Sequence, residues 1–579
     1  MYILQIYSKI SDFIKIVVAN FFTIITSFNY FKLFLADSKF KKMKNYLLFC
    51  TIVLSSVSQF AQVSFTNENG LIGNYPDYSE VAVDMNGDYL DDYVRVSETG
   101  IGIDYQQPDG TFISTFINIA IANVPNWSVA AADIDENGYN DLVLGNGSRV
   151  SFLFANSDGT VYFEDAHPEY IFSQRSTFSD IDNDGDIDAF VCHDVDESHP
   201  YRNDGNQIMV LDQNLIQTLD RPGNYAAIWV DYDNDGDSDM YLTKCRGGAL
   251  PGDENRDNAM YTNNGDGTFT ENGLEINMRD NAQSWATVFE DFDNDGDFDA
   301  FIVNHDFQNR FMENDGTGVF TDIIATTGIN PDDLGAWENQ SGDFDNDGFV
   351  DIFSELSKEL YLNNGDLTFT GIDLPFDEGG IGDFNNDGFL DVVNDGDLWI
   401  NNGNGNNWVK IGLEGVESNL NGIGARIEIY GDWGRQIREI RSGQGFSHMN
   451  SLVAHFGIGT STVIDQIIIH WPSGTVDYID NPNMNETHII VEGSNPLAVT
   501  DFEINGINIY PNPTTDYINF SLKGLENTPV SIIDLNGKLI VNTKISTDNS
   551  INVTSLNSGV YFVQLEVEKQ TVSYKFVKN

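Results

Sequence analysis

The chain reads Asp180-Ile-Asp-Asn-Asp-Gly-Asp-Ile-Asp188, and this aspartate-rich loop returns along its length. Close copies are Asp231-Tyr-Asp-Asn-Asp-Gly-Asp-Ser-Asp239 and Asp291-Phe-Asp-Asn-Asp-Gly-Asp-Phe-Asp299, and looser copies start at Asp84, Asp133, Asp343 and Asp383. Acids at loop positions 1, 3, 5 and 9, with Gly at position 6 for a sharp turn, suit a hard cation that takes six to eight oxygen ligands. Carboxylates this close together need a compensating ion. The sequence therefore predicts seven calcium loops.

Each loop is expected to bind Ca²⁺ through the side chains at positions 1, 3, 5 and 9 and through the carbonyl at position 7. Loop 1 is the weakest, because Tyr89 stands where Gly is wanted, and loop 7 has Asn385 in place of an Asp. The candidate ligands, loop by loop, are Asp84, Asn86, Asp88 and Asp92; Asp133, Asp135, Asn137 and Asp141; Asp180, Asp182, Asp184 and Asp188; Asp231, Asp233, Asp235 and Asp239; Asp291, Asp293, Asp295 and Asp299; Asp343, Asp345, Asp347 and Asp351; and Asp383, Asn385, Asp387 and Asp391.

The spacing of the loops predicts the fold. They start about 40 to 60 residues apart, a period typical of propellers and solenoids. Apolar and β-branched runs follow them, which indicates strands and excludes the helix that an EF-hand or dockerin loop needs. A second motif, as in Tyr261-Thr-Asn-Asn-Gly-Asp-Gly-Thr-Phe269 and Tyr361-Leu-Asn-Asn-Gly-Asp-Leu-Thr-Phe369, indicates a tight hairpin. Four strands in each of seven units predict an all-β, seven-bladed β-propeller.

The two ends of this region predict how the ring closes. Phe65-Thr-Asn-Glu-Asn-Gly-Leu71 is similar to Phe269-Thr-Glu-Asn-Gly-Leu274, which ends an earlier unit, whereas the last unit runs into Asn401-Asn-Gly-Asn without such a strand. The N-terminal strand is therefore expected to complete the final blade and remove the open edge. With these features, residues 62–405 resemble the FG-GAP/VCBS repeats of integrin α-type propellers, a resemblance that implies fold and calcium but leaves function open.

A second group of motifs follows the repeats. They are Asn407-Trp-Val-Lys-Ile-Gly-Leu-Glu-Gly415, Ser418-Asn-Leu-Asn-Gly-Ile-Gly-Ala-Arg426, Gly443-Gln-Gly-Phe446, His455-Phe-Gly-Ile-Gly459 and Trp471-Pro-Ser-Gly474. Alternating apolar residues predict a small β domain over residues 406–494. The ordered motifs resemble the ASPIC/UnbV domain that follows FG-GAP propellers in cartilage acidic protein and in bacterial exported proteins.

The C-terminal residues 505–579, after a linker at 495–504, carry Ile509-Tyr-Pro-Asn-Pro-Thr514, Ile533-Asp-Leu-Asn-Gly-Lys538 and Ser558-Gly-Val-Tyr-Phe562. Their strand pattern predicts an immunoglobulin-like β-sandwich. The blocks resemble the type A sorting domain of the type IX secretion system. That resemblance implies the secretion machinery as a partner, export across the outer membrane of a Bacteroidota-type bacterium, and tail removal followed by surface attachment or release.

The N-terminal residues are typical of a leader. Lys41, Lys42 and Lys44 precede an apolar run, so residues 43–61 are interpreted as a signal peptide cut after Ala61, with Ser58 as the alternative. Residues 1–42 are interpreted as an extension from a mis-called start codon, the alternative being a double hydrophobic leader. The cysteines that remain, Cys192 and Cys245, are expected either to pair or to stay as buried thiols.

Charge narrows the range of partners. Acids outnumber bases 89 to 29, which gives a formal net charge of −60. Seven Ca²⁺ ions, each adding two charges, would leave −46. Nucleic acids and anionic lipids draw their affinity from Lys and Arg, so neither is an expected partner, and the mature form is expected to have no integral membrane contact. The composition favours a secreted or outer-surface protein living where calcium is plentiful.

The residue pattern places a ligand surface opposite the calcium loops. An aromatic residue stands six positions before the loop in five units: Tyr78, Trp127, Tyr225, Trp285 and Trp337. Because six strand residues span about 20 Å, these rings should start the innermost strands at the far face, where integrin-like propellers bind partners. That face should also carry the long connections 192–201 and 244–260. The rings either pack between blades or form a platform for a sugar or peptide.

No catalytic motif is recognised, and the eight histidines are scattered, with His455 expected to serve in local packing. Arg426, Arg435, Arg438 and Arg441 are expected to be solvated or paired with nearby Glu residues, or otherwise to hold anionic glycans. The function predicted from the sequence is an exported calcium-binding adhesion or binding module for glycan or protein. The alternative is a propeller-based enzyme acting on polysaccharide, whose sign would be a compact His/Tyr/Arg/Asp cluster around the central channel.

Overall fold

The computed structural model describes residues 63–205, 208–219, 221–332, 338–354, 358–377, 379–495, 509–521, 528–534, 538–567 and 570–579. The predicted leader segments, the linker from residue 496 onward and Trp337 lie outside these ranges. Val63 belongs to a separate N-terminal unit, and all the elements below belong to the second unit, Ser64–Asn579. No helix among the described residues is long and apolar enough to cross a membrane.

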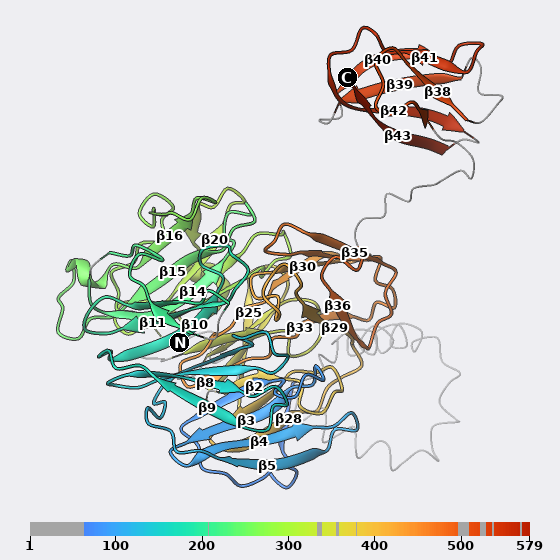
Figure 1. Ribbon diagram of the computed structural model, residues 1–579. Coiled ribbons are helices and arrows are strands. Elements are labelled where there is room, and N and C mark those ends of the chain that lie inside the picture. The colour runs from blue at the N-terminus through green and yellow to red at the C-terminus, as the bar shows by residue number, and fades with distance from the viewer. Residues whose placement is uncertain are drawn as a thin grey trace, which may run out of the picture. The chain divides into compact units, whose positions relative to one another are not determined.

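Seven four-stranded antiparallel sheets lie between Phe65 and Asn401, and in six of them the strands are neighbours in sequence and in space (Figure 1). The first three are β2 (Ser79–Val83), β3 (Asp92–Ser97), β4 (Gly100–Gln106) and β5 (Phe112–Asn118); β6 (Ser128–Ala132), β7 (Asp141–Gly145), β8 (Val150–Ala155) and β9 (Tyr162–Ala166); and β10 (Ser173–Ser179), β11 (Asp188–His193), β12 (His199–Arg202) and β13 (Val210–Leu211). The next three are β14 (Asn224–Val230), β15 (Asp239–Lys244), β16 (Ala259–Asn263) and β17 (Phe269–Glu271); β18 (Ser284–Glu290), β19 (Asp299–Asn304), β20 (Arg310–Asn314) and β21 (Phe320–Asp322); and β22 (Asn339–Gly342), β23 (Asp351–Ser354), β24 (Glu359–Asn363) and β25 (Phe369–Asp373). Two short helices, η2 (Glu254–Arg256) and α3 (Ile324–Thr327), lie in connections.

The last sheet is closed by the N-terminal strand, as the sequence predicts. It contains β26 (Gly380–Gly382), β27 (Asp391–Asn394) and β28 (Asp397–Asn401), and β1 (Phe65–Asn67) pairs antiparallel with β28. Phe65 lies opposite Asn401, so chain segments more than 300 residues apart form one sheet edge. The expected order of strand, aspartate loop, strand, connection, strand, turn and strand is confirmed in the six sheets whose strands are consecutive, and the last sheet takes its fourth strand from β1.

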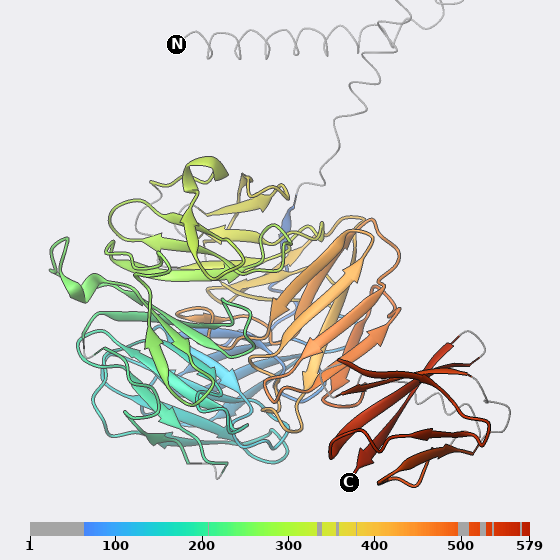
Figure 2. The same cartoon turned by 90° about the horizontal axis from the view of Figure 1, so that it is seen from above.

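The first strand of each sheet is the innermost. These strands contact one another in the order β26, β2, β6, β10, β14, β18 and β22. Every residue of β2, β6 and β10 is buried, whereas the outer strand β5 is mostly exposed. Strands buried on both faces favour small or apolar residues, as in the run Ser128-Val-Ala-Ala-Ala132, although β2 and β10 also carry the buried charged residues Glu80 and Arg175. The turned view in Figure 2 shows the sheets following one another in chain order.

The second domain forms two sheets after the ring. One is β33 (Ala454–Gly459), β29 (Asn407–Glu414) and β36 (Thr487–Val491); the other is β31 (Gly434–Glu439), β30 (Arg426–Gly431), β34 (Gln466–His470) and β35 (Val476–Asp480). The tail likewise forms two sheets. They are β37 (Ile509–Tyr510), β38 (Tyr517–Phe520) and β41 (Ser550–Asn552), and β40 (Leu539–Lys544), β39 (Pro529–Asp534), β42 (Gly559–Val567) and β43 (Gln570–Lys578).

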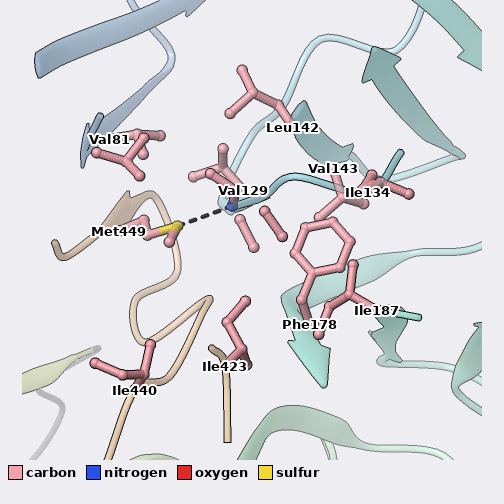
Figure 3. Packing of buried hydrophobic residues seen from close by; sticks show 14 of the residues in the cluster. Val81, Val129, Ile134, Leu142, Val143, Phe178, Ile187, Ile423, Ile440 and Met449 are labelled. Carbon is pink, nitrogen blue, oxygen red and sulfur yellow. Dashed lines mark hydrogen bonds between the residues drawn. The ribbon is translucent and has the colours of Figure 1, made fainter. Parts of the chain in front are cut away.

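One stretch of the second domain, residues 440–451, enters the middle of the ring, and we call it the central segment. Its strand β32 (His448–Met449) pairs in parallel with β2 and makes that sheet five-stranded. Met449 is fully buried, and its Sδ accepts a hydrogen bond from the backbone N–H of Ala131 at 2.9 Å. Figure 3 shows this contact, with Met449 lying beside Val81 and Val129 and with Ile440 nearby.

The central segment touches the inner strand of other sheets too. Ser442 donates to the carbonyl of Ala131 at 2.7 Å and bridges to Phe178 in β10. Arg441 donates to the Phe289 carbonyl in β18, and Ser451 donates its N–H to the Ile381 carbonyl in β26. The ring is therefore packed around a segment of the second domain, which the sequence pattern did not predict.

Candidate functional site

Each aspartate loop is shaped by two residues in the left-handed backbone region, at positions 4 and 6. Position 4 is Asn in most loops, as in Asn183 with φ of 59°, and position 6 is Gly, as in Gly185 with φ of 96°. Gly adopts positive φ without strain, and Asn tolerates it better than most residues. Loop 1 reverses the arrangement, with Gly87 at position 4 and Tyr89 at position 6, yet Tyr89 still has φ of 61°.

The aspartates at positions 1 and 9 hold each loop in shape. In loop 2, Asp133 accepts hydrogen bonds from the backbone N–H groups of Asn137 and Gly138, at 3.0 and 2.6 Å. Asp141 accepts from Ile134 at 2.9 Å and from Ala155, at the end of the third strand, at 2.7 Å. Position 9 therefore fastens the loop to its own sheet, whether or not a cation is present.

Five loops bring acid oxygens close enough to share one cation. Two ligands of the same Ca²⁺, each about 2.3–2.6 Å from it, lie at most about 5 Å apart. Three carboxylates of each of these loops offer oxygens within 4.8 Å of one another. The sets are Asp133, Asp135 and Asp141; Asp180, Asp182 and Asp188; Asp231, Asp233 and Asp239; Asp291, Asp293 and Asp295; and Asp343, Asp345 and Asp347. Asp184, Asp235, Asp299 and Asp351, although predicted as ligands, lie outside these sets.

The donor set fits a hard cation on two further observations. Buried carboxylate oxygens Asp135 Oδ1, Asp182 Oδ1 and Asp233 Oδ1, all at position 3, have no hydrogen-bond partner among the described residues. Burial, reinforced by neighbouring carboxylates, raises the pKa of Asp180 to about 7 and that of Asp239 to about 9. Oxygens that are buried, unpartnered and costly to ionise are those that a divalent cation stabilises.

Loops 1 and 7 differ from the other five. Within the described residues, neither brings three acid oxygens together. In loop 7 the ammonium of Lys410, from the second domain, lies 2.6 Å from Asp383 Oδ2 and 3.0 Å from Asn386 Oδ1. Lys410 and Asp383 are both buried, so a protein cation already balances the position-1 carboxylate there. In loop 1, Asp84 accepts three backbone N–H groups, from Asn86, Gly87 and Tyr89.

A buried Asn at the end of the third strand links neighbouring sheets. Asn363 Nδ2 donates to the carbonyl of Phe292, in the loop of the preceding sheet, at 2.7 Å, and its backbone N–H donates to Asp351 at 2.9 Å. Asn203, Asn314 and Asn401 make the same cross-sheet bond. From the sequence, the Asn-Asn-Gly motif predicted only a turn, although its repeated first Asn was the signal for this second role.

The second domain covers the loop end of the ring and touches every loop. Glu414 meets Tyr89 of loop 1 and Asn421 meets Asp133 of loop 2. The remaining contacts, from loop 3 to loop 7, are Glu417 with Gly185, Arg426 with Asn234, Arg435 with Asp295, Gly459 with Asn346, and Lys410 with Asp383. His455 is buried and contacts the Gly388 carbonyl at 2.9 Å, so its expected packing role is confirmed.

The arginines of the second domain are engaged inside the protein. Arg426 pairs with Glu428 at 3.1 Å and Arg441 with Glu439 at 2.8 Å, as one interpretation of the sequence expects. Arg438 is buried, and its guanidinium lies 5.1 Å from the Phe456 ring. These side chains therefore neutralise acids at the domain contact.

The opposite end of the ring holds a pocket of about 360 Å³. Three of the predicted aromatic residues line it, Trp127, Tyr225 and Trp285, together with Phe172 and with Phe446 of the central segment. Trp127, Tyr225, Trp285 and Phe172 are each partly exposed. Tyr78, the fourth predicted ring among the described residues, is 49% exposed and does not line the pocket. The predicted place of these rings, at the starts of the inner strands, is thus confirmed, and three of them converge on one pocket.

A chain of charged and polar groups lies beneath this pocket. Arg175 lies 3.6 Å from Glu338, His448 lies 3.7 Å from both Glu338 and Glu80, and Tyr93 donates to Glu80. All five side chains are buried. Of these groups only Glu338 lines the pocket.

The structure also shows whether the two described cysteines pair and at which end of the ring the long connections lie. Cys192 and Cys245 are buried free thiols, so they do not pair. The connections after β11 and β15 lie at the pocket end, as predicted, because the second strands run away from the aspartate loops. Within them, Arg246 contacts Asp194 at 3.4 Å and Arg256 contacts Asp306 at 2.7 Å.

Four family models match parts of the chain. Residues 125–163 match the FG-GAP repeat, and residues 291–354 match an FG-GAP-like repeat. Residues 415–497 match ASPIC and UnbV, and residues 508–579 match a secretion system C-terminal sorting domain. The chain carries FG-GAP repeats, an ASPIC/UnbV domain and a sorting domain. These are the domains that its motifs resemble, and the sorting domain indicates export to the cell surface or secretion through the type IX machinery.

No curated protein matches the chain. Among solved structures, Sqt1 of Saccharomyces cerevisiae is 9% identical, with a TM-score of 0.37, over 72% of this chain and 100% of that one. A protein from Lactobacillus plantarum is 14% identical, with a TM-score of 0.32, over 52% and 86% of the two chains. Likeness at these scores carries no argument about function.

Proposed function

We propose that this protein is an exported, calcium-stabilised binding module whose ligand, a glycan or a protein, sits in the aromatic pocket. In this proposal residues 62–405 form a seven-bladed propeller, residues 406–494 an ASPIC/UnbV domain, residues 495–504 a linker and residues 505–579 an immunoglobulin-like sorting tail. Seven four-stranded sheets with contacting inner strands and a closing N-terminal strand support the propeller.

Calcium belongs in the five loops whose acids converge. There the side chains at position 1, position 3 and either position 5 or 9 would hold the ion, which would supply the positive charge that buried carboxylates need. Lys410 supplies part of that charge in loop 7. Calcium titration of the chelated protein, followed by calorimetry, should give five strong sites. A finding of no calcium uptake would remove the metal from the proposal.

One observation carries the binding role: rings predicted from sequence meet in one pocket while their faces stay partly exposed. A ring that is open to a pocket can contact a ligand as well as pack against its neighbours. A glycan array and a surface-protein pull-down, both with the secreted form, test the role directly. Trp127→Ala and Trp285→Ala should each weaken binding and leave the calcium-dependent melt nearly intact. If each instead mainly lowers stability by about 3–5 kcal/mol, the rings serve packing alone.

The loop end is a poorer place for a ligand. It is covered by the second domain, and the arginines that could hold anionic glycans already contact acids and carbonyl groups there. The pocket end therefore remains the surface on which an adhesion partner would bind.

A polysaccharide-degrading enzyme is the second candidate, and the chain Arg175–Glu338–His448–Glu80–Tyr93 is the observation that favours it. It supplies the compact His/Tyr/Arg/acid cluster expected of such an enzyme around the central channel. Against it, the five groups are buried and contact one another, and of the five only Glu338 lines the pocket. A reducing-end assay on a polysaccharide panel decides: turnover lost in His448→Gln would make the protein an enzyme.

Export is tested separately. Deleting residues 505–579 should trap the protein in the periplasm, because the tail serves as the secretion address. Normal appearance of the truncated protein in the medium or at the surface would contradict the sorting role.

A further inference from the structure

The chemistry of the aromatic pocket points to one class of ligand group. We infer that the pocket binds a cationic ammonium group, in particular a quaternary or trimethylated one carried by a small molecule, a glycan substituent or a modified side chain. This inference rests on the proposed function in one respect, since it takes the aromatic pocket as the binding site. It adds the chemical identity of the group that the pocket recognises.

The first support is the number and arrangement of the rings. Trp127 and Phe172 lie side by side, with ring centroids 6.0 Å apart, and so do Tyr225 and Trp285, at 5.5 Å. Phe446 approaches Tyr225 edge-on at 6.5 Å. Two ring pairs and a fifth ring thus line one pocket of about 360 Å³, at the small end of the range for ligand sites. Aromatic faces attract cations through their quadrupoles.

The second support is that the polar tips of the rings are engaged elsewhere. Trp127 donates its indole N–H to the Ser173 carbonyl at 2.9 Å, and Trp285 donates to Cys245 Sγ at 3.0 Å. The Tyr225 hydroxyl lies beside the Cys245 thiol. A sugar hydroxyl would find few donors on these residues, whereas a methylated ammonium needs none and gains from the ring faces.

The third support is charge. Among the described residues that line the pocket, the charged ones are Asp194 and Glu338, both acids. Their cationic neighbours are Arg246, 3.4 Å from Asp194, and Arg175 and His448, 3.6 and 3.7 Å from Glu338, and none of the three lines the pocket. The whole chain carries −60. Close to the pocket the two acids are largely balanced by these neighbours, but they are the charged groups that line it, and the long-range field of the chain favours a positive ligand.

The protein already uses this chemistry on one of the rings. The guanidinium carbon of Arg175 lies 4.8 Å from the Phe446 ring centroid, on a ring that lines the pocket. A cation beside Phe446 is thus part of the fold, and a second cation in the pocket would meet further rings of the same kind.

Choline and 3,3-dimethylbutan-1-ol form the decisive pair of compounds. They have the same shape, but a neutral carbon replaces the ammonium nitrogen in the alcohol. Isothermal titration of the calcium-loaded secreted protein should show choline binding at least tenfold more tightly than the alcohol, about 1.4 kcal/mol. Equal affinities, or no binding of choline at millimolar concentration, would overturn the inference.

Variants tie the effect to the pocket. Trp285→Ala and Asp194→Asn should each lower choline affinity several-fold, and Asp194→Asn should leave the weak affinity for the alcohol unchanged. Tyr78→Ala is the matched control, because Tyr78 has the same place relative to its loop but does not line the pocket. Trp285→Phe should restore much of the binding, and a melt of each variant checks its fold. Choline affinity unaltered by Trp285→Ala and Asp194→Asn would contradict the inference.

The test is separable from that of the proposed function. If a glycan or protein binds at the pocket, and Trp285→Ala abolishes that binding, but choline and the alcohol bind alike, then the binding role stands and the cation inference fails. If choline binds as expected but neither array nor pull-down yields a larger ligand, the cation site stands and the adhesion role fails.

Discussion

The two ends of the inner strands differ in what surrounds them and in the role that we propose for each. At one end each strand runs into an aspartate loop, and all seven loops are covered by the second domain. At the other end the strands start at aromatic residues, and the pocket between these stays open. The loop end recurs in every repeat, whereas four sheets and the central segment bring their rings together at the pocket. We infer that the aspartate loops, which are repeated, stabilise the ring, whereas the aromatic residues, which differ between sheets, provide the ligand surface.

Removing calcium should have the largest effect on stability, and the effect should arise at the loop end, where the aspartate clusters lie. Chelation leaves clusters of three carboxylates, at least one of them buried in each cluster, without a cation. A site held at about 100 times its dissociation constant contributes about 2.7 kcal/mol. Over several loops we expect a drop in melting temperature larger than that of any single substitution, reversed by added Ca²⁺. Calorimetry with and without chelator measures it. An unchanged melt in excess chelator would rule out calcium as the stabilising ion.

The pH dependence of stability in the chelated protein is a second test of calcium binding at the loop end. Burial raises the pKa of Asp133 and Asp231 to about 7 and that of Asp141 to about 9, above the ordinary 3.8 of the unfolded chain. The folded state then binds more protons than the unfolded state between about pH 4 and 9, so stability falls as pH rises through that window. We expect the melting temperature without calcium to fall from about pH 5 to about pH 8.5. With calcium the carboxylates stay ionised, and the slope should be much smaller; equal slopes would contradict metal binding.

Truncating Met449 tests whether the second domain and the ring are one stable body. Its side chain is fully buried among residues of both, so Met449→Ala should cost about 2–5 kcal/mol. Chemical unfolding, followed by tryptophan fluorescence, measures the loss. Met484→Ala, where the side chain is only partly buried, serves as the control and should cost less. If Met449→Ala costs no more than the control, the central segment does not hold the ring.

The smallest expected effect concerns the cross-sheet Asn residues. Asn363→Ala removes three side-chain hydrogen bonds, one to the preceding sheet and two within its own sheet, and should cost about 1–3 kcal/mol. Its sequence neighbour Asn364 is exposed and bonds only within its own turn, so Asn364→Ala should have little effect. The same unfolding measurement on both variants compares them. Equal losses would show that the cross-sheet bond contributes nothing of its own.

Much of this arrangement could be predicted from the sequence, because the same local sequence pattern recurs seven times. Loop positions, strand order, closure by Phe65–Asn67 and the placement of Trp127, Tyr225 and Trp285 all follow from local patterns. The central segment does not. Gly443-Gln-Gly-Phe446 has no strand period, and the partners of the segment lie in separate parts of the chain. Lys410 escaped notice for the same reason, since its acid partner comes from another domain.

The central segment also affects when the ring can assemble during folding. Ala131 and Met449, which bond to each other, stand 318 positions apart, and Phe65 pairs with Asn401 across a similar separation. Contacts of such sequence separation form late, because a long loop must close before they gain anything. A chain that ends before residue 451 would form the sheets of the ring but would lack the complete central segment around which they pack. Copies whose synthesis has not reached the central segment should therefore stay open and aggregation-prone.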